Sequence, residues 1–146
     1  MNAPPSDTGS YLTPRLEHAR VADAMHHGIL SCASDATLRD AARTMAQHHV
    51  HMIVVTDARD GAPLGCVSDT ALLRLLLAPD GGARTLGEVA DRNFDRVASN
   101  EPLASAAALM RDEGTAHLLV QDEHTGRPVG VLSTLDVAGV LAWGEA

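Results

Sequence analysis

The chain has 146 residues and a formal net charge of −8, and all 11 of its basic residues are arginine. Without lysine it cannot supply a P-loop lysine, a Schiff-base lysine or a lysine general base. The acidic balance and the three scattered aromatic residues exclude the basic, base-stacking surfaces typical of nucleic-acid binders. The sequence contains neither a signal peptide nor an apolar run near the roughly 18 residues of a membrane span. We therefore expect a cytoplasmic protein with neither a nucleic-acid nor a membrane partner.

The local pattern predicts a strand, a helix, two further strands and a second helix, in that order and twice. In the first round, short strands at 29–33, 52–55 and 64–67 surround a helix with one apolar face, formed by Leu38, Ala41, Ala42 and Met45. Asp60-Gly61 supplies the hairpin turn, and the last helix starts after Ser68. The predicted divisions are a tail at 1–16, a first repeat at 17–78, a linker at 79–84 and a second repeat at 85–146.

The second round is a copy of the first at a constant offset of 65 residues. Between 21–76 and 86–141 no gap is needed, and 13 of the 56 paired residues are identical. Chance would give roughly three or four identities, so the chain contains an internal duplication. In the second copy the corresponding strands lie at 95–98, 118–120 and 129–132, and Pro102 falls in the first turn of the helix, where a missing N–H is tolerated.

The last helix of each copy is apolar on most of its faces. Residues 71–78 are interrupted only by Arg74, and the second copy has Val137, Val140, Leu141 and Trp143. Such a helix is buried on most faces. One face packs on its own sheet, and the other packs either on the partner repeat or on a second chain, so we expect a homodimer.

This repeated pattern resembles the cystathionine-β-synthase (CBS) domain pair, or Bateman module. The residues that carry the resemblance are VADAM at 21–25, TLRDAARTM at 37–45, PLGCVSDTALL at 63–73, LASAAALM at 103–110 and PVGVLSTLDV at 128–137. The resemblance implies an α/β fold of two βαββα repeats packed sheet to sheet about a pseudo-two-fold axis. It also implies two clefts that bind adenosine ligands, namely AMP, ADP, ATP, S-adenosylmethionine or NAD, and a regulatory role without catalysis.

The second copy matches the ribose-and-phosphate signature of this family, a strand ending in Gly, two hydrophobic residues and Ser, followed by x-x-Asp. Here it reads Gly130-Val131-Leu132-Ser133-Thr134-Leu135-Asp136. Ser133 and the first helical N–H groups would face a phosphate. Asp136 would accept both ribose hydroxyls, and Val131 would pack on adenine together with Leu30. Ser-x-x-Asp is also close to a capping box, which is a purely structural alternative.

The first copy departs from the signature. Ala71 stands where the ribose carboxylate is expected, and Asp69 places a negative charge at the helix start. We therefore expect one competent cleft, on the second copy, and a degenerate second site with Ser68, Cys66 and Ala71. By the family pattern the competent cleft also borrows Met25 and residues 28–31, including Gly28, Leu30 and Ser31. His117, and His51 in the first copy, stand where the family often has a basic residue.

The remaining histidines and the two cysteines offer weaker signals. His26, His27, His48, His49 and His51 cluster in the sequence, but they lack cysteine or carboxylate partners at metal-ligand spacing, so no metal site is expected. Cys32 and Cys66 align with valines and are most simply small buried hydrophobes.

The sequence thus predicts a non-enzymatic CBS pair that binds one adenosine nucleotide or S-adenosylmethionine as a regulatory ligand and signals to a separate effector protein. Two alternatives stay open. One is a ligand-free scaffold, and the other is a metal or redox sensor that uses the histidine cluster or Cys32 and Cys66.

Overall fold

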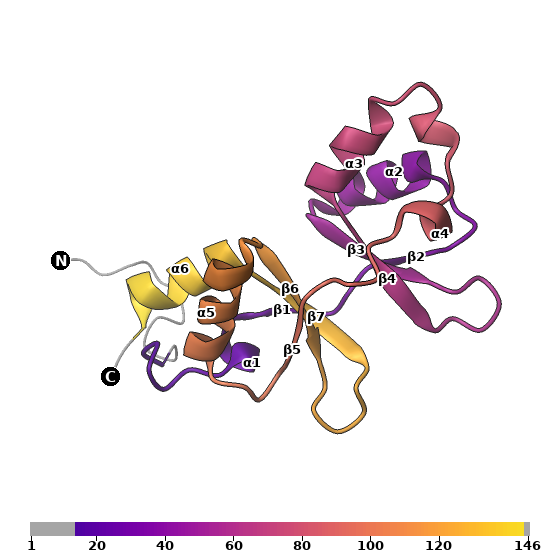
Figure 1. Ribbon diagram of the computed structural model, residues 1–146. Helices are drawn as coiled ribbons and strands as arrows, with labels where there is room; N and C mark the ends of the chain where they lie inside the picture. The colour runs from indigo at the N-terminus through magenta and orange to yellow at the C-terminus, as the bar shows by residue number, and fades with distance from the viewer. Residues whose placement is uncertain (1–13, 145–146) are drawn as a thin grey trace. The chain divides into compact units, whose positions relative to one another are not determined.

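The computed structural model describes residues 14–144 and divides the chain into two compact units (Figure 1). One unit joins the residues up to Gly28 to those from Asp95 onward, and the other runs from Ile29 to Phe94. Residues 1–13 of the predicted tail and residues 145–146 of the predicted second repeat lie outside the described residues. Each unit is a mixed α/β structure with its own sheet and its own apolar core, which confirms the predicted fold class.

The unit from Ile29 to Phe94, here called the 29–94 unit, is built around a three-stranded sheet in the order β2-β3-β4. Strand β2 pairs parallel with β3, which forms an antiparallel hairpin with β4. Its elements in chain order are β2 (Ser31–Ala33), α2 (Leu38–His48), β3 (Met52–Thr56), β4 (Pro63–Ser68), α3 (Asp69–Leu76), the 3₁₀ turn η3 (Gly81–Ala83) and α4 (Leu86–Val89).

The other unit, here called the terminal unit, has a four-stranded sheet in the order β1-β7-β6-β5. Its elements in chain order are α1 (Val21–Ala24), β1 (His26–His27), β5 (Arg96–Ala98), α5 (Leu103–Glu113), β6 (His117–Gln121), β7 (Pro128–Ser133) and α6 (Thr134–Trp143). The two-residue strand β1 was not predicted from the sequence. It is followed by Gly28, whose positive φ of 87° ends the strand before β2.

The helices and strands of the structure repeat at the same offset of 65 residues as the sequence. Five pairs of elements have bounds that differ by 65 at both ends, and α3 and α6 begin 65 residues apart. The pairs are α1 and α4, β2 and β5, α2 and α5, β3 and β6, and β4 and β7. The predicted order of elements in each copy is therefore correct, with one local difference: Pro102 is the N-cap of α5 and precedes its first turn.

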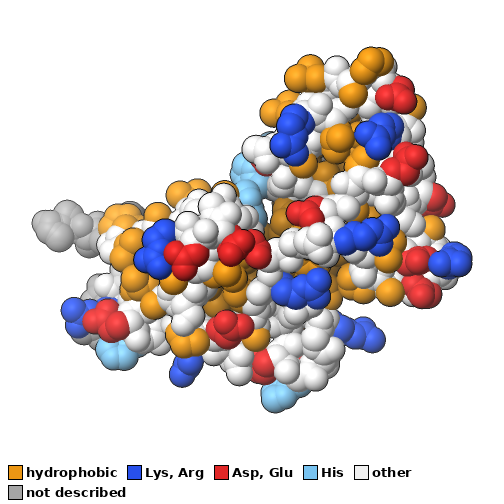
Figure 2. Space-filling model, in the orientation of Figure 1, with side chains coloured by type: hydrophobic (Ala, Val, Ile, Leu, Met, Phe, Trp, Pro, Cys, Tyr) orange, Lys and Arg blue, Asp and Glu red, His pale blue; other side chains and the backbone are white. Residues whose placement is uncertain are grey.

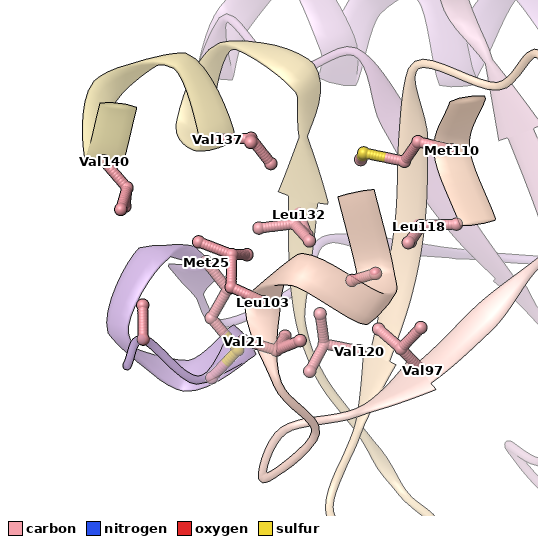
Figure 3. Close-up of a cluster of buried hydrophobic side chains, with 12 residues drawn as sticks. Val21, Met25, Val97, Leu103, Met110, Leu118, Val120, Leu132, Val137 and Val140 are labelled. Carbon is pink, nitrogen blue, oxygen red and sulfur yellow. The ribbon is translucent and has the colours of Figure 1, made fainter. Parts of the chain in front are cut away.

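The first helix of each copy packs on the core of the other copy. Val21 of α1 and Met25, which follows the helix, lie among core residues of the second copy such as Leu103 and Leu132 (Figure 3). In the same way Leu86, from α4, is fully buried in the core of the first copy. The compact units therefore do not coincide with the sequence repeats, because each unit takes its first helix from the other repeat.

The exchanged segments are held by matching backbone hydrogen bonds. Val21 N–H donates to Glu101 C=O at 2.9 Å, and 65 residues later Leu86 N–H donates to Ala36 C=O at 2.8 Å. Further along, His26 pairs with Val131 and Asp91 pairs with Cys66. Because buried backbone groups need such partners, these bonds fix where each exchanged segment lies.

Two glycines make the close approach of these segments possible. A Cβ added at Gly65 would lie 2.6 Å from the carbonyl oxygen of Asp91, and one added at Gly130 would collide with the carbonyl oxygen of His26. The first residue of the Gly-x-x-Ser pattern is therefore a packing requirement, whatever the site nearby binds.

We expect Gly130→Ala to lower the free energy of unfolding by about 1–3 kcal/mol, because the added methyl group meets backbone that cannot rotate away. Gly139→Ala is the matched control, since nothing lies within 4 Å of a Cβ added there and the position is inside α6. Helix propensity predicts a gain of up to about 1 kcal/mol for it. Urea unfolding of both variants measures the difference, and equal stabilities would contradict the packing argument.

Candidate functional site

The start of α6 is a capping box formed by two residues of the predicted site. Ser133 Oγ accepts a hydrogen bond from Asp136 N–H at 3.2 Å, and Asp136 Oδ2 accepts one from Ser133 N–H at 2.8 Å. The side chain of Asp136 is only 8% exposed. The structural alternative that the sequence offered for Ser-x-x-Asp is therefore present, and it fixes the carboxylate in one orientation.

An imidazole from the exchanged segment completes the environment of this carboxylate. His26 Nδ1 lies 3.0 Å from Asp136 Oδ1, 110 residues away in the chain. From the sequence, His26 is expected only as a member of the histidine cluster, with no connection to Asp136. The connection depends on the pairing of β1 with β7, and the two-residue β1 gives no periodic signal in the sequence.

Most of the N–H groups at the start of α6 already have partners within the protein. Thr134 N–H donates to Ala116 C=O at 3.0 Å, and Asp136 N–H donates to Ser133 Oγ. Two of the first three helical N–H groups are thus engaged, and a carboxylate stands in the first turn. This end of the helix is consequently a weaker phosphate cradle than the sequence analysis assumed.

Val131 and His117 lie on the same sheet as these groups. Val131 pairs with Leu119 across the β6–β7 hairpin, and His117 pairs with Ser133. Since Leu118 and Val120 belong to the helix-covered core, alternation places Leu119 and Val131 on the opposite face of the sheet. Val131 is half-buried. It therefore offers an apolar surface on β7, the strand that leads directly into the helix of Asp136.

The residues expected to be borrowed from the first copy are divided between the two units. Met25 and Gly28 belong to the terminal unit, where Gly28 N–H donates to Val129 C=O at 2.8 Å. Leu30, Ser31 and His51 belong to the 29–94 unit. The terminal unit therefore contains Met25, Gly28, Ser133 and Asp136. The roles of Leu30, Ser31 and His51 in a ligand site stay predictions.

The corresponding place in the first copy has a different set of charged groups. Ser68 Oγ caps α3 by accepting from Ala71 N–H at 3.2 Å. Asp69 N–H donates to His51 C=O, and Asp69 Oδ2 lies 2.7 Å from His51 Nδ1. Thr70 N–H donates to Asp69 Oδ1 at 2.8 Å, so all three leading N–H groups of α3 have internal partners.

The position of His26 in the terminal unit corresponds to Asp91 in the 29–94 unit. Asp91 exchanges two backbone hydrogen bonds with Cys66, and its Oδ1 accepts from Asn93 N–H at 2.9 Å. Where the terminal unit has an imidazole facing a carboxylate, the 29–94 unit has Asp91 and Ala71. The two sites therefore differ in charge as well as in the signature.

Cysteine and metal chemistry find little support in the described part of the chain. Cys66 is buried, as expected for a small hydrophobe, and Cys32 is half-buried with Sγ 3.9 Å from Thr44 Oγ1. Across residues 14–144, no three histidine, cysteine or acidic side chains are placed to hold a metal ion together. None of the helices in that range is long and apolar enough to cross a membrane.

The CBS-domain family model matches residues 21–78 and 86–142. The chain belongs to the CBS-domain family. Both matches begin at the exchanged helices α1 and α4, so the family repeat follows the sequence and not the compact units. A search of curated proteins finds no match.

Solved structures of CBS-domain proteins share this fold. An uncharacterised conserved protein from Pyrococcus horikoshii has a TM-score of 0.76 at 22% identity, over 84% of this chain and 92% of the other. The CBS domain pair of MJ0100, in complex with 5′-methylthioadenosine and S-adenosyl-L-methionine, has a TM-score of 0.74 at 19% identity, over 85% and 96%. The CBS domain of a bacterial CNNM/CorC family Mg²⁺ transporter, in complex with ATP, has a TM-score of 0.73 at 21% identity, over 93% and 94%. At these identities the likeness shows the fold alone.

The caps predict similar effects on stability in the two copies. Ser133→Ala and Ser68→Ala each remove the acceptor for one helical N–H, and each should lower the free energy of unfolding by about 1 kcal/mol. Ser105→Ala, at an exposed position inside α5, should cost nothing. Urea unfolding without ligand checks this, and a loss confined to one copy would contradict it.

Proposed function

We propose that this CBS pair is a regulatory module that binds one adenosine-containing ligand at the Asp136 site of the second copy and passes the signal to a separate effector protein. The observation that carries the proposal is the Asp136 carboxylate. It is held in the first turn of α6, with Oδ2 fixed by Ser133 N–H and Oδ1 turned toward an exposed histidine. A ribose hydroxyl can donate to a carboxylate oxygen that is held in one orientation in this way.

The surroundings of Asp136 support a nucleoside more strongly than a polyphosphate. Val131 offers an apolar surface on β7, and the hydroxyl group of Ser133 already accepts the hydrogen bond that caps α6. With two N–H groups of α6 engaged and a protein net charge of −8, several phosphates would find few donors at this helix start. Adenosine, 5′-methylthioadenosine and S-adenosylmethionine are therefore the favoured ligands within the class that also contains AMP, ADP, ATP and NAD.

Calorimetric titration and thermal unfolding with these seven compounds test the proposal. A ligand at about 100 times its Kd adds about 2.7 kcal/mol to the stability of the folded state. Asp136→Asn should abolish the gain, because the amide replaces one acceptor oxygen by a donor while the other oxygen can still accept from Ser133 N–H.

Ser68→Ala is the matched control in the first copy and should retain the ligand-induced gain measured against its own unliganded state. Equal losses in Asp136→Asn and Ser68→Ala would contradict a single site on the second copy. If none of the seven compounds stabilises the wild-type protein, the scaffold alternative replaces the proposal.

We further propose that the protein is a homodimer in which the last helices of the two copies meet a second chain. Among residues 14–144, five large hydrophobic residues are exposed at 50% or more, and they lie on α3, at its C-terminal end or on α6: Leu73, Leu77, Leu135, Leu141 and Trp143. Hydrophobic side chains reach the surface over both helices (Figure 2). An apolar surface of this kind is typical of an interface.

Sedimentation velocity should give twice the 15.3 kDa chain mass for the wild type. Leu77→Glu and Leu141→Glu should each shift the protein to the monomer, since a charge in an apolar interface is left unpaired. Ala104→Glu, on the exposed side of α5, is the control and should stay dimeric. A monomeric wild type would refute the interface.

A further inference from the structure

The carboxylate proposed to bind ribose already has an imidazole in front of it. His26 Nδ1 lies 3.0 Å from Asp136 Oδ1 and 3.3 Å from Oδ2. The two side chains differ strongly in exposure, at 79% for His26 and 8% for Asp136. Solvent therefore reaches the imidazole freely, whereas the carboxylate is covered.

The oxygen that a ligand needs is the one that His26 contacts. Asp136 Oδ2 is committed to Ser133 N–H at 2.8 Å, and breaking this bond would open the cap of α6. Oδ1 is therefore the oxygen that can accept from an incoming hydroxyl. It is also the oxygen closest to the imidazole, so the ribose and His26 compete for it.

The backbone holds His26 at this position while its side chain stays free to move. His26 pairs with Val131 in the β1–β7 ladder. Because Gly130 has no side chain, the carbonyl group of His26 can approach β7 closely. Its largely exposed imidazole can change rotamer without disturbing the ladder. In the first copy the equivalent residues are Asp91 and Ala71, so this arrangement is particular to the competent copy.

We propose that His26 sets the affinity of the adenosine site by acting as a latch on Asp136, which the ribose hydroxyls must displace. This inference rests on the proposed function and adds a residue outside the Gly-x-x-Ser-x-x-Asp signature. The imidazole satisfies the carboxylate in the unliganded protein. Ligand binding replaces one hydrogen-bonded contact of Asp136 by another, and only the surplus appears as affinity.

Calorimetric titration of adenosine, 5′-methylthioadenosine, S-adenosylmethionine and ATP into wild type, His26→Ala and His27→Ala tests the latch. His26→Ala should bind about two- to fivefold more tightly, because a contact made by a largely exposed imidazole contributes about 1 kcal/mol or less. His27→Ala removes the neighbouring exposed imidazole of the same strand and should bind like the wild type. A structural defect in His26→Ala would weaken binding, so tighter binding separates the latch from a merely structural role.

A second measurement follows the imidazole itself. In ¹⁵N-resolved NMR spectra, saturating ligand should shift the ring signals of His26 as the ring leaves the carboxylate, and the shift should be absent in Asp136→Asn. Unchanged or weaker binding in His26→Ala, or unchanged ring signals in the liganded wild type, would overturn the latch and leave the proposed function intact. If neither the wild type nor His26→Ala binds any of the four compounds, the proposed function itself fails, and the latch with it.

Discussion

The reciprocal exchange of the two N-terminal segments is the constraint on which the rest of the structure depends. Each core is completed by a helix from the other copy, through Val21 in one unit and Leu86 in the other, both fully buried. The same exchange places His26 beside β7 and Asp91 beside β4. The start of α6 therefore meets a segment more than 100 residues away, so the contact between His26 and Asp136 needs residues from both sequence copies.

Most of the fold could be predicted from the sequence because its signals are local and occur twice. The 3.6-residue periodicity of residues 38–45 predicted α2, and the Asp-Gly turn predicted the hairpin that follows. The exchange of α1 and α4 could not be predicted in the same way. Each of these helices has only four residues, and its sequence does not show which of the two cores it packs on.

In the candidate site, too, the residues with a local sequence signal could be predicted, and those that depend on tertiary pairing could not. Ser133 and Asp136 were found because a cap and a ribose acceptor both need specific residue types at fixed spacing on one helix. His26 was missed because its role comes from a two-residue strand pairing across 110 positions. The engaged N–H group of Thr134 was missed for a related reason, since its partner, the carbonyl group of Ala116, is known only once the tertiary structure is known.

The last helices of the two copies share a helix cap but differ in the acidic residue of the first turn. Both need a side-chain oxygen at the N-cap, and Ser68 and Ser133 both supply it. The first copy keeps a capped helix without a carboxylate at position 71, so capping alone does not require Asp136. The Asp136 carboxylate is nearly buried, is oriented by Ser133 N–H and contacts an exposed imidazole. This arrangement goes beyond what the helix cap needs, and the proposal of a ligand site on the second copy rests on it.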